Sequence, residues 1–198
     1  TLSHFMSHAK FSTAEMQTLY ALQVMHLYKI KSGYFIIDDT MQHHTNYCKW
    51  IHGVFVLFDH ALKTNLKAIC IVVLYYSDGE SIKFPIKHEI YYQDTDNMPW
   101  QQGKQSVCIP KYDLAVEMLE WALHNGFPKC IVLADSWFGI GAFIKELRRL
   151  KLSYVVEIKS TYTVRMPCKT PKLTPKGRLA KNQYDLITLP AVFQAVLM

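Results

Sequence analysis

The sequence predicts an α/β fold in which helices flank a mixed β-sheet, and three observations support this. Two short apolar runs, residues 35–37 and 130–134, lead directly into aspartate. Between them lie two longer segments that are rich in β-branched and aromatic residues and are joined by a turn. Segments with helical spacing of apolar residues precede the first run and stand on either side of the second. With 198 residues, 50% of them hydrophobic, the chain can form one ordinary domain with a sizeable core.

The first expected element is a helix over about residues 13–29. Ser12 and Glu15 form the S-x-x-E pattern of a capping box, and apolar residues recur behind them at roughly helical spacing. Gly33 ends the connection to the next element. The pattern therefore predicts a helical lead-in to the first strand.

A strand over residues 34–39 follows and ends in two adjacent carboxylates, Asp38 and Asp39. Neighbouring side chains on a strand point to opposite faces, so only one of the two can serve a given site. The other is expected to bond to the following turn. Beyond it, the neighbours His43 and His44 suggest a metal, but no third ligand stands at a suitable spacing, which favours a solvated loop.

Two antiparallel strands are expected next, over residues 67–76 and 82–92, with a turn at 77–80. Pro85 marks a bulge or an edge in the second of them. The stretch before this pair, 50–58, is expected to be extended around His52, whose role the sequence leaves open.

The second half alternates helices and strands after a long loop at residues 93–110. A helix is expected over 111–125, a strand buried on both faces over 130–134, a helix over 142–150 and a strand over 153–160. Antiparallel strands first, followed by alternating helices and strands, is the layout of a ribonuclease-H-like sheet.

The C-terminal part is basic and proline-rich. The whole chain carries a formal charge of +6 and a pI near 9.0, which favours a polyanionic partner. We expect a helical lead-in at residues 1–33, a partial ribonuclease-H-like core at 34–160, and a basic arm or the start of an inserted subdomain at 161–198. A solvated charge run is an equally good explanation of the basic residues alone.

The two aspartates that end apolar strands are the candidate site. If their strands are parallel neighbours, Asp39 and Asp135 emerge at one edge of the sheet, where they would repel each other. A divalent cation removes that repulsion, and hard oxygen ligands favour Mg²⁺ or Mn²⁺. Such clusters support in-line phosphoryl transfer. The alternative is that each aspartate only forms a turn or a helix cap, as Asp135-Ser136 would allow.

The motifs around these aspartates resemble those of bacterial insertion-sequence DDE transposases, over about residues 34–159. The similarity is carried by Ile36-Ile37-Asp38-Asp39-Thr40 and by Val132-Leu133-Ala134-Asp135-Ser136-Trp137-Phe138-Gly139. The resemblance implies a ribonuclease-H-like fold, Mg²⁺ dependence, and DNA strand cleavage and joining at transposon ends. By the match, Asp39 is the first catalytic and metal-binding acid, Asp38 is secondary, and Asp135 is the second acid.

The chain departs from that family at the third acid, a glutamate within a Tyr-x-x-Arg-x-x-x-Glu pattern. Here Tyr162 and Arg165 begin the pattern, but Lys169 stands where the glutamate belongs. Glu146 and Glu157 follow Asp135 too closely to replace it. We therefore expect a catalytic domain that stops before its third acid.

The resemblance also implies the partners. DNA, as transposon ends and target, is the expected partner, with Lys159 and Arg165 contacting phosphates, and a homodimer in the DNA complex is possible. Trp137 and Phe138 either stack on a displaced base or pack under the sheet. The longest apolar run is too short to cross a bilayer. Five scattered cysteines suit a reducing cytoplasm, and the resemblance implies a bacterial, nucleoid-associated location there.

Two other functions are weighed against this one. A non-catalytic DNA-binding remnant would keep the fold but lack the third acid. A phosphate-transferring enzyme with an aspartate nucleophile fits poorly, because that chemistry needs Asp-x-Asp at the first strand and this chain has an adjacent pair, Asp38 and Asp39.

Overall fold

A computed structural model describes residues 12–45, 47, 51, 53–92, 108–168 and 170–188 of the chain. The chain forms two compact units, Thr1–Val156 and Glu157–Met198. The long loop expected at residues 93–110 lies mostly outside the described residues, as does His52. The three-part division at residues 33 and 160 stays a prediction.

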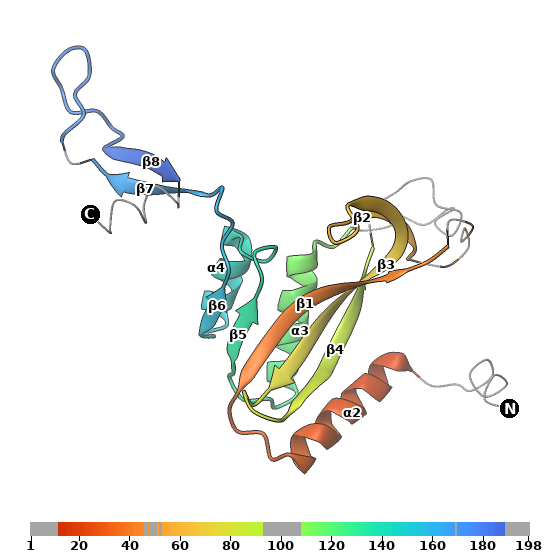
Figure 1. Ribbon diagram of the computed structural model, residues 1–198. Coiled ribbons are helices and arrows are strands. Elements are labelled where there is room, and N and C mark those ends of the chain that lie inside the picture. Colours follow the sequence, from red (N-terminus) through yellow and green to blue (C-terminus); the bar gives the residue numbers. More distant parts are fainter. Residues whose placement is uncertain are drawn as a thin grey trace, which may run out of the picture. The chain divides into compact units, whose positions relative to one another are not determined.

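The first unit is built on one mixed sheet (Figure 1). Its elements are α2 (Thr13–Leu27), β1 (Tyr34–His43), β2 (Phe55–Asp59), β3 (Thr64–Ser77), β4 (Lys83–Tyr91), α3 (Lys111–His124), β5 (Ile131–Ala134), α4 (Gly141–Arg149) and β6 (Tyr154–Val156). The strand order is β2-β3-β1-β5-β6, and β4 also pairs with β3. β3 is antiparallel to β1, β2 and β4, whereas β5 is parallel to both β1 and β6. Antiparallel strands followed by parallel ones confirm the predicted ribonuclease-H-like α/β fold.

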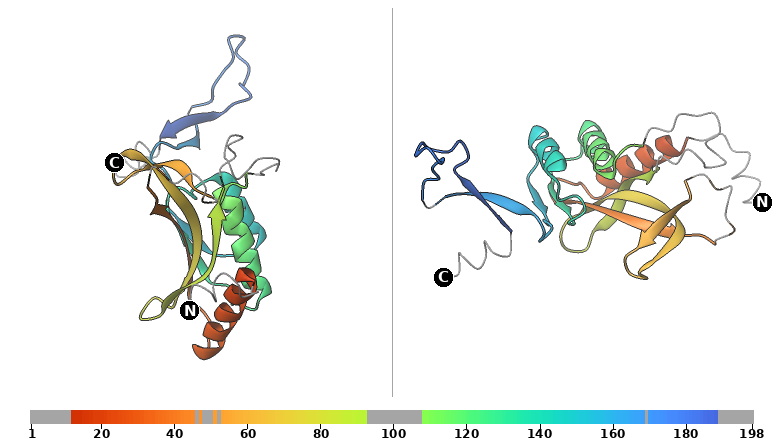
Figure 2. Two further views of the ribbon diagram at one scale, coloured as in Figure 1. Left: turned by 90° about the vertical axis from the view of Figure 1, so that its right-hand side faces the viewer. Right: turned by 90° about the horizontal axis from the view of Figure 1, so that it is seen from above.

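The helices α2, α3 and α4 lie on the same side of this sheet (Figure 2). The alternation along β1 explains the arrangement, since Phe35 and Ile37 are buried on the face that the helices cover. On β5, Val132 is fully buried but Ile131 is 38% exposed. The expectation that β5 is buried on both faces was therefore wrong, because the described helices cover only one.

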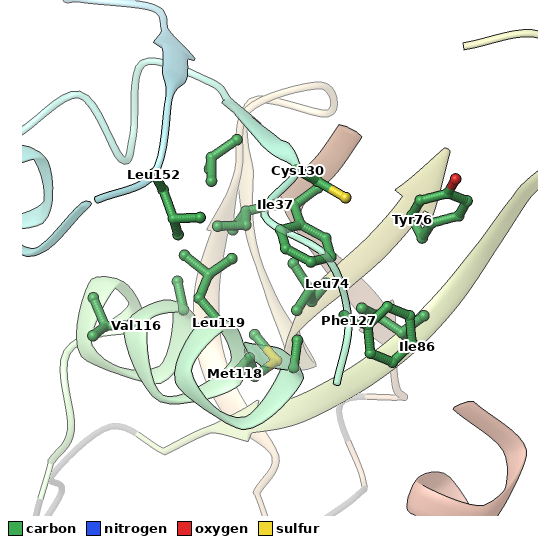
Figure 3. Close-up of a cluster of buried hydrophobic side chains, with 14 of the residues drawn as sticks. Ile37, Leu74, Tyr76, Ile86, Val116, Met118, Leu119, Phe127, Cys130 and Leu152 are labelled. Atoms are coloured by element: carbon green, nitrogen blue, oxygen red, sulfur yellow. The ribbon is translucent and has the colours of Figure 1, made fainter. Parts of the chain in front are cut away.

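The core lies between α3 and the sheet (Figure 3). Met118 and Leu119 on α3 are fully buried in one cluster with Leu74 on β3 and Ile37 on β1. This close packing of aliphatic side chains fixes α3 against the strands that carry the candidate site.

Two strands differ in length from their predictions. β1 runs on to His43 instead of ending at Asp39, because β3 continues to pair with it as far as Ala68. β6 spans three residues instead of 153–160, because its partner β5 ends at Ala134, opposite Val156. The predicted irregularity at Pro85 is present: the pairing of β3 with β4 shifts register there.

Gly33 is a position where we expect a large effect from a single methyl group. Its φ is +150°, and an added Cβ would lie 2.5 Å from the backbone oxygen of Ser77 and 2.7 Å from the ring of Tyr76. We expect Gly33→Ala to lower the free energy of unfolding by roughly 1–3 kcal/mol. Urea unfolding followed by circular dichroism measures this. Gly141→Ala is the matched control, because nothing lies within 4 Å of its added Cβ, and an equal loss there would contradict the steric explanation.

The second unit holds a two-stranded antiparallel sheet of β7 (Thr163–Pro167) and β8 (Tyr184–Thr188). An ion pair joins Lys172 to Asp185 at 2.7 Å. Lys159 and Arg165 both belong to this unit and are exposed.

Candidate active site

The structure brings Asp39 and Asp135 to one cavity of about 320 Å³. Their strands are parallel neighbours, as predicted, with a register that ends at Ile37 opposite Ala134. Asp135 is therefore the first residue after the paired part of β5. Asp39 does not end its strand, because β1 continues past it.

Asp39 lies on the helix-covered face of β1, in step with Ile37, and its side chain is 18% exposed. Its Oδ2 accepts a hydrogen bond from Lys111 Nζ at 2.6 Å and one from Cys70 Sγ at 3.4 Å. Burial, partly offset by the Lys111 charge, raises the pKa of the Cys70 thiol to about 11. Cys70 therefore stays a protonated hydrogen-bond donor to Asp39 near neutral pH.

Asp38 points to the opposite face and does not line this cavity. Its Oδ1 accepts a hydrogen bond from the backbone N–H of Asp39 at 2.9 Å. The expected bond to a following turn was wrong, because the strand continues and no turn follows. Burial raises the pKa of Asp38, and the neighbouring charges of Asp39 and Asp135 add to this effect.

Asp135 both forms a turn and lines the candidate site, the two roles between which the sequence left the choice open. Its Oδ1 accepts a hydrogen bond from the backbone N–H of Trp137 at 3.0 Å, which makes it the first residue of a turn. Its side chain also lines the cavity with Asp39. The turn thus holds the carboxylate at the end of β5.

Lys111 is the site residue that sequence reasoning missed. It is the first residue of α3, and its ammonium lies 5.3 Å from the ring centre of Tyr91 and 5.0 Å from that of Trp137. A lysine in the first turn of a helix opposes the helix dipole, which is a signal that the side chain serves another purpose. Burial is the largest single influence on the pKa of Lys111 and lowers it, but the hydrogen bonds and charges of Asp39 and Cys70 together outweigh burial, and the net shift is upward. The ammonium therefore stays charged.

Among the described residues that line this cavity, Asp39 and Asp135 are the only two acids. Likewise, the described part of the chain holds no group of three His, Cys, Asp or Glu placed to bind one metal ion. Glu146 instead pairs with Arg149 at 2.5 Å beside a different cavity. Glu157 belongs to the second unit.

The histidines after Asp39 lie mostly outside this cavity. His43 is the last residue of β1 rather than part of a loop, and its Nε2 lies 2.8 Å from Asp59 Oδ2. Asp59 also accepts backbone hydrogen bonds from Ala61 and Leu62, which lower its pKa together with His43. Asp59 therefore stabilises the turn between β2 and β3 through its backbone hydrogen bonds, and its pair with His43 links that turn to the end of β1.

The strand order defines a ribonuclease-H-like α/β fold, and two carboxylates from neighbouring strands line one cavity. A family model for DDE superfamily endonucleases matches residues 1–195, so the chain belongs to that family. This confirms the DDE resemblance. A similar solved structure is piggyBac transposase in a cryo-EM synaptic complex with hairpin DNA, at 13% identity and a TM-score of 0.40. That match covers 74% of this chain and 32% of that one. No curated protein sequence matches.

Within the described residues, no helix has the length and apolar character that a membrane crossing requires.

Proposed function

We propose that this chain is the catalytic core of a DNA transposase that cleaves and joins DNA strands at transposon ends with the help of Mg²⁺ or Mn²⁺. The observation that carries the proposal is that Asp39 and Asp135, from neighbouring parallel strands, line one cavity. Membership of the DDE superfamily endonuclease family supports cleavage of a phosphodiester as the class of reaction, and strand joining is part of the proposal.

The donor atoms of the cavity suit a hard divalent cation. Two carboxylates are the protein ligands that Mg²⁺ commonly takes, with waters and substrate phosphate oxygens completing its shell. Asp39 and Asp135 would hold the ion. The chemistry it supplies is activation of the attacking oxygen and stabilisation of the leaving oxygen in an in-line displacement.

The chain's own residues orient and balance these carboxylates. The backbone N–H of Trp137 holds the Asp135 carboxylate at the end of β5. Cys70 and Lys111 both donate hydrogen bonds to Oδ2 of the Asp39 carboxylate. The turn fixes the Asp135 carboxylate and Cys70 fixes the Asp39 carboxylate, which lowers the reorganisation needed when a phosphate enters. Lys111, in contrast, balances the charge of Asp39 before an ion binds.

The second unit supplies the proposed DNA contacts, Lys159 and Arg165. Both are exposed and lie in the basic part of the chain. We expect the double variant Lys159→Gln/Arg165→Gln to weaken DNA binding and to reduce the slope of log K against log salt concentration by about one to two. Fluorescence anisotropy at several salt concentrations measures it. The matched control is Lys172→Gln, whose ammonium is already paired with Asp185; an equal change in slope there would contradict the assignment.

A non-catalytic DNA-binding remnant is the second candidate. The observation in its favour is the absence of a third acid among the described residues of the cavity. Incubation with supercoiled plasmid in Mn²⁺ separates the two functions. Nicking that stops with a chelator supports the transposase core, whereas salt-sensitive binding without nicking supports the remnant. A homodimer on DNA and a nucleoid-associated location in a bacterial cell belong to the same proposal.

A further inference from the structure

The ammonium of Lys111 lies beside Asp39, at the position where a divalent metal ion would bind in the cavity. This ammonium is 2.6 Å from Asp39 Oδ2 and is the only ammonium or guanidinium group among the described residues that line this cavity. We propose that Lys111 is a built-in competitor for the divalent ion: it neutralises Asp39 while the ion is absent and must leave Asp39 when the ion binds. This inference rests on the proposed function of Asp39 and Asp135 as the metal ligands.

Competition follows from where the charges lie. The side chains of Lys111 and Asp39 are only 13% and 18% exposed, so water and salt screen the pair weakly. A divalent ion bound directly to Asp39 would stand within a few ångströms of the ammonium, and the two positive charges would repel each other. Oδ2 already accepts hydrogen bonds from both Lys111 and Cys70, which leaves it little capacity for a further partner.

The ammonium of Lys111 also has two aromatic neighbours that do not depend on Asp39. The rings of Tyr91 and Trp137 both lie within reach of Nζ, and aromatic faces attract cations at such distances. These rings would continue to stabilise the ammonium when the ion takes its place beside Asp39.

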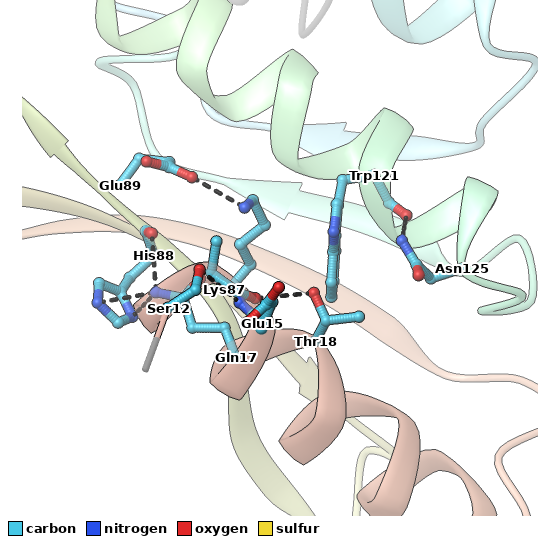
Figure 4. A network of polar contacts seen from close by, with 10 residues as sticks. Ser12, Glu15, Gln17, Thr18, Lys87, His88, Glu89, Trp121 and Asn125 are labelled. Carbon is cyan, nitrogen blue, oxygen red and sulfur yellow. Dashed lines mark hydrogen bonds and ion pairs between the residues drawn. The ribbon is translucent and has the colours of Figure 1, made fainter. Parts of the chain in front are cut away.

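A matched lysine elsewhere in the unit controls for general effects. Lys87 Nζ pairs with Glu89 at 2.9 Å and lies 5.1 Å from the ring centre of Trp121, and its side chain is also 13% exposed (Figure 4). Lys87 resembles Lys111 in its burial, in having a carboxylate partner and in lying over an aromatic ring, and it does not line the cavity of Asp39 and Asp135. Lys87→Met thus removes a comparable ion pair without touching the cavity.

Titration of the full chain with Mn²⁺ by isothermal calorimetry tests the proposal. We expect Lys111→Met to bind Mn²⁺ on the order of tenfold more tightly than the unmodified chain, a change that the loss of one nearby competing charge produces. Lys87→Met should bind as the unmodified chain does. Equal or weaker binding by Lys111→Met overturns the inference alone. If neither the unmodified chain nor Lys111→Met binds Mn²⁺, the proposed function fails and the inference fails with it.

A second measurement uses the unmodified chain, so its result does not depend on whether a substituted chain folds. Lysine side-chain ammonium signals in heteronuclear NMR spectra of the unmodified chain report ion pairing directly. We expect one ammonium signal to shift when diamagnetic Mg²⁺ is added, with the same midpoint as calorimetric Mg²⁺ binding. Mg²⁺ binding with every lysine signal unmoved would overturn the inference and leave the proposed function standing.

Discussion

Asparagine in place of Asp39 or Asp135 is expected to abolish divalent-ion binding and to lower DNA nicking by roughly a thousandfold or more. Metal stabilisation of a phosphoryl-transfer transition state is worth several kcal/mol, and each 1.36 kcal/mol is a factor of ten in rate. An amide keeps the size of the carboxylate but removes the negative charge that holds the ion. Calorimetry with Mn²⁺ and plasmid nicking measure the two effects.

Asp38→Asn is the matched control for this pair of variants. It removes a carboxylate from the same strand, one residue from Asp39, but its side chain lies outside the cavity. We expect ion binding and nicking to stay within about threefold of the unmodified chain, since a solvent-screened neighbouring charge has only a small effect. A loss in Asp38→Asn as large as in Asp39→Asn would contradict the assignment of the ligand.

The two ligand variants should differ in stability. Asp39→Asn leaves the ammonium of Lys111 without its ion pair in a poorly solvated position, which we expect to cost about 1–3 kcal/mol. Asp135 pairs with a backbone N–H of its own turn, and asparagine can accept the same bond. Urea unfolding of both variants therefore distinguishes loss of binding from loss of folding.

Phe138→Ala is expected to lower the free energy of unfolding by about 3–5 kcal/mol, the range found when a buried phenylalanine is truncated. Phe138 is fully buried and packs against Phe143, with 5.7 Å between ring centres. This burial decides between the two roles considered for the residue, because a ring inside the core cannot stack on a base. Thermal and urea unfolding measure the loss.

Trp137 is the natural comparison, since it is the neighbouring aromatic residue and is 49% exposed. We expect Trp137→Ala to cost no more than about 1 kcal/mol of stability. Weakened DNA binding by Phe138→Ala at unchanged stability would contradict the core assignment, and so would a larger stability loss in Trp137→Ala than in Phe138→Ala.

The order of the elements from α2 to β6 was largely predictable, because most of them have a strong local pattern, whereas β7 and β8 were not predicted in the basic segment. Helical spacing, β-branched runs and turn residues identified α2, α3, α4 and the strands from β3 to β5. The ends of β1 and β6 were not predictable in the same way. A strand continues as long as a neighbour offers hydrogen bonds, and that depends on β3 and β5 rather than on local sequence.

The candidate site also has one part that the sequence could predict and one part that depends on tertiary packing. The approach of Asp39 to Asp135 could be predicted, because parallel neighbouring strands place their carboxyl ends at one edge. The contact of Lys111 with Asp39 could not be predicted, because Lys111 lies 72 residues after Asp39 and reaches it only through the packing of α3 on the sheet. Its position at the N-terminus of a helix was the available signal.

The most direct test of the account is a crystal of this chain soaked in Mn²⁺ and measured for anomalous scattering. We predict a peak in the cavity with oxygens of both Asp39 and Asp135 at about 2.0–2.2 Å, as hard divalent ions require, and with Lys111 Nζ displaced from Asp39. A Mn²⁺ peak elsewhere, or one that contacts neither of these aspartates, would contradict the claim that the two carboxylates form the catalytic metal site.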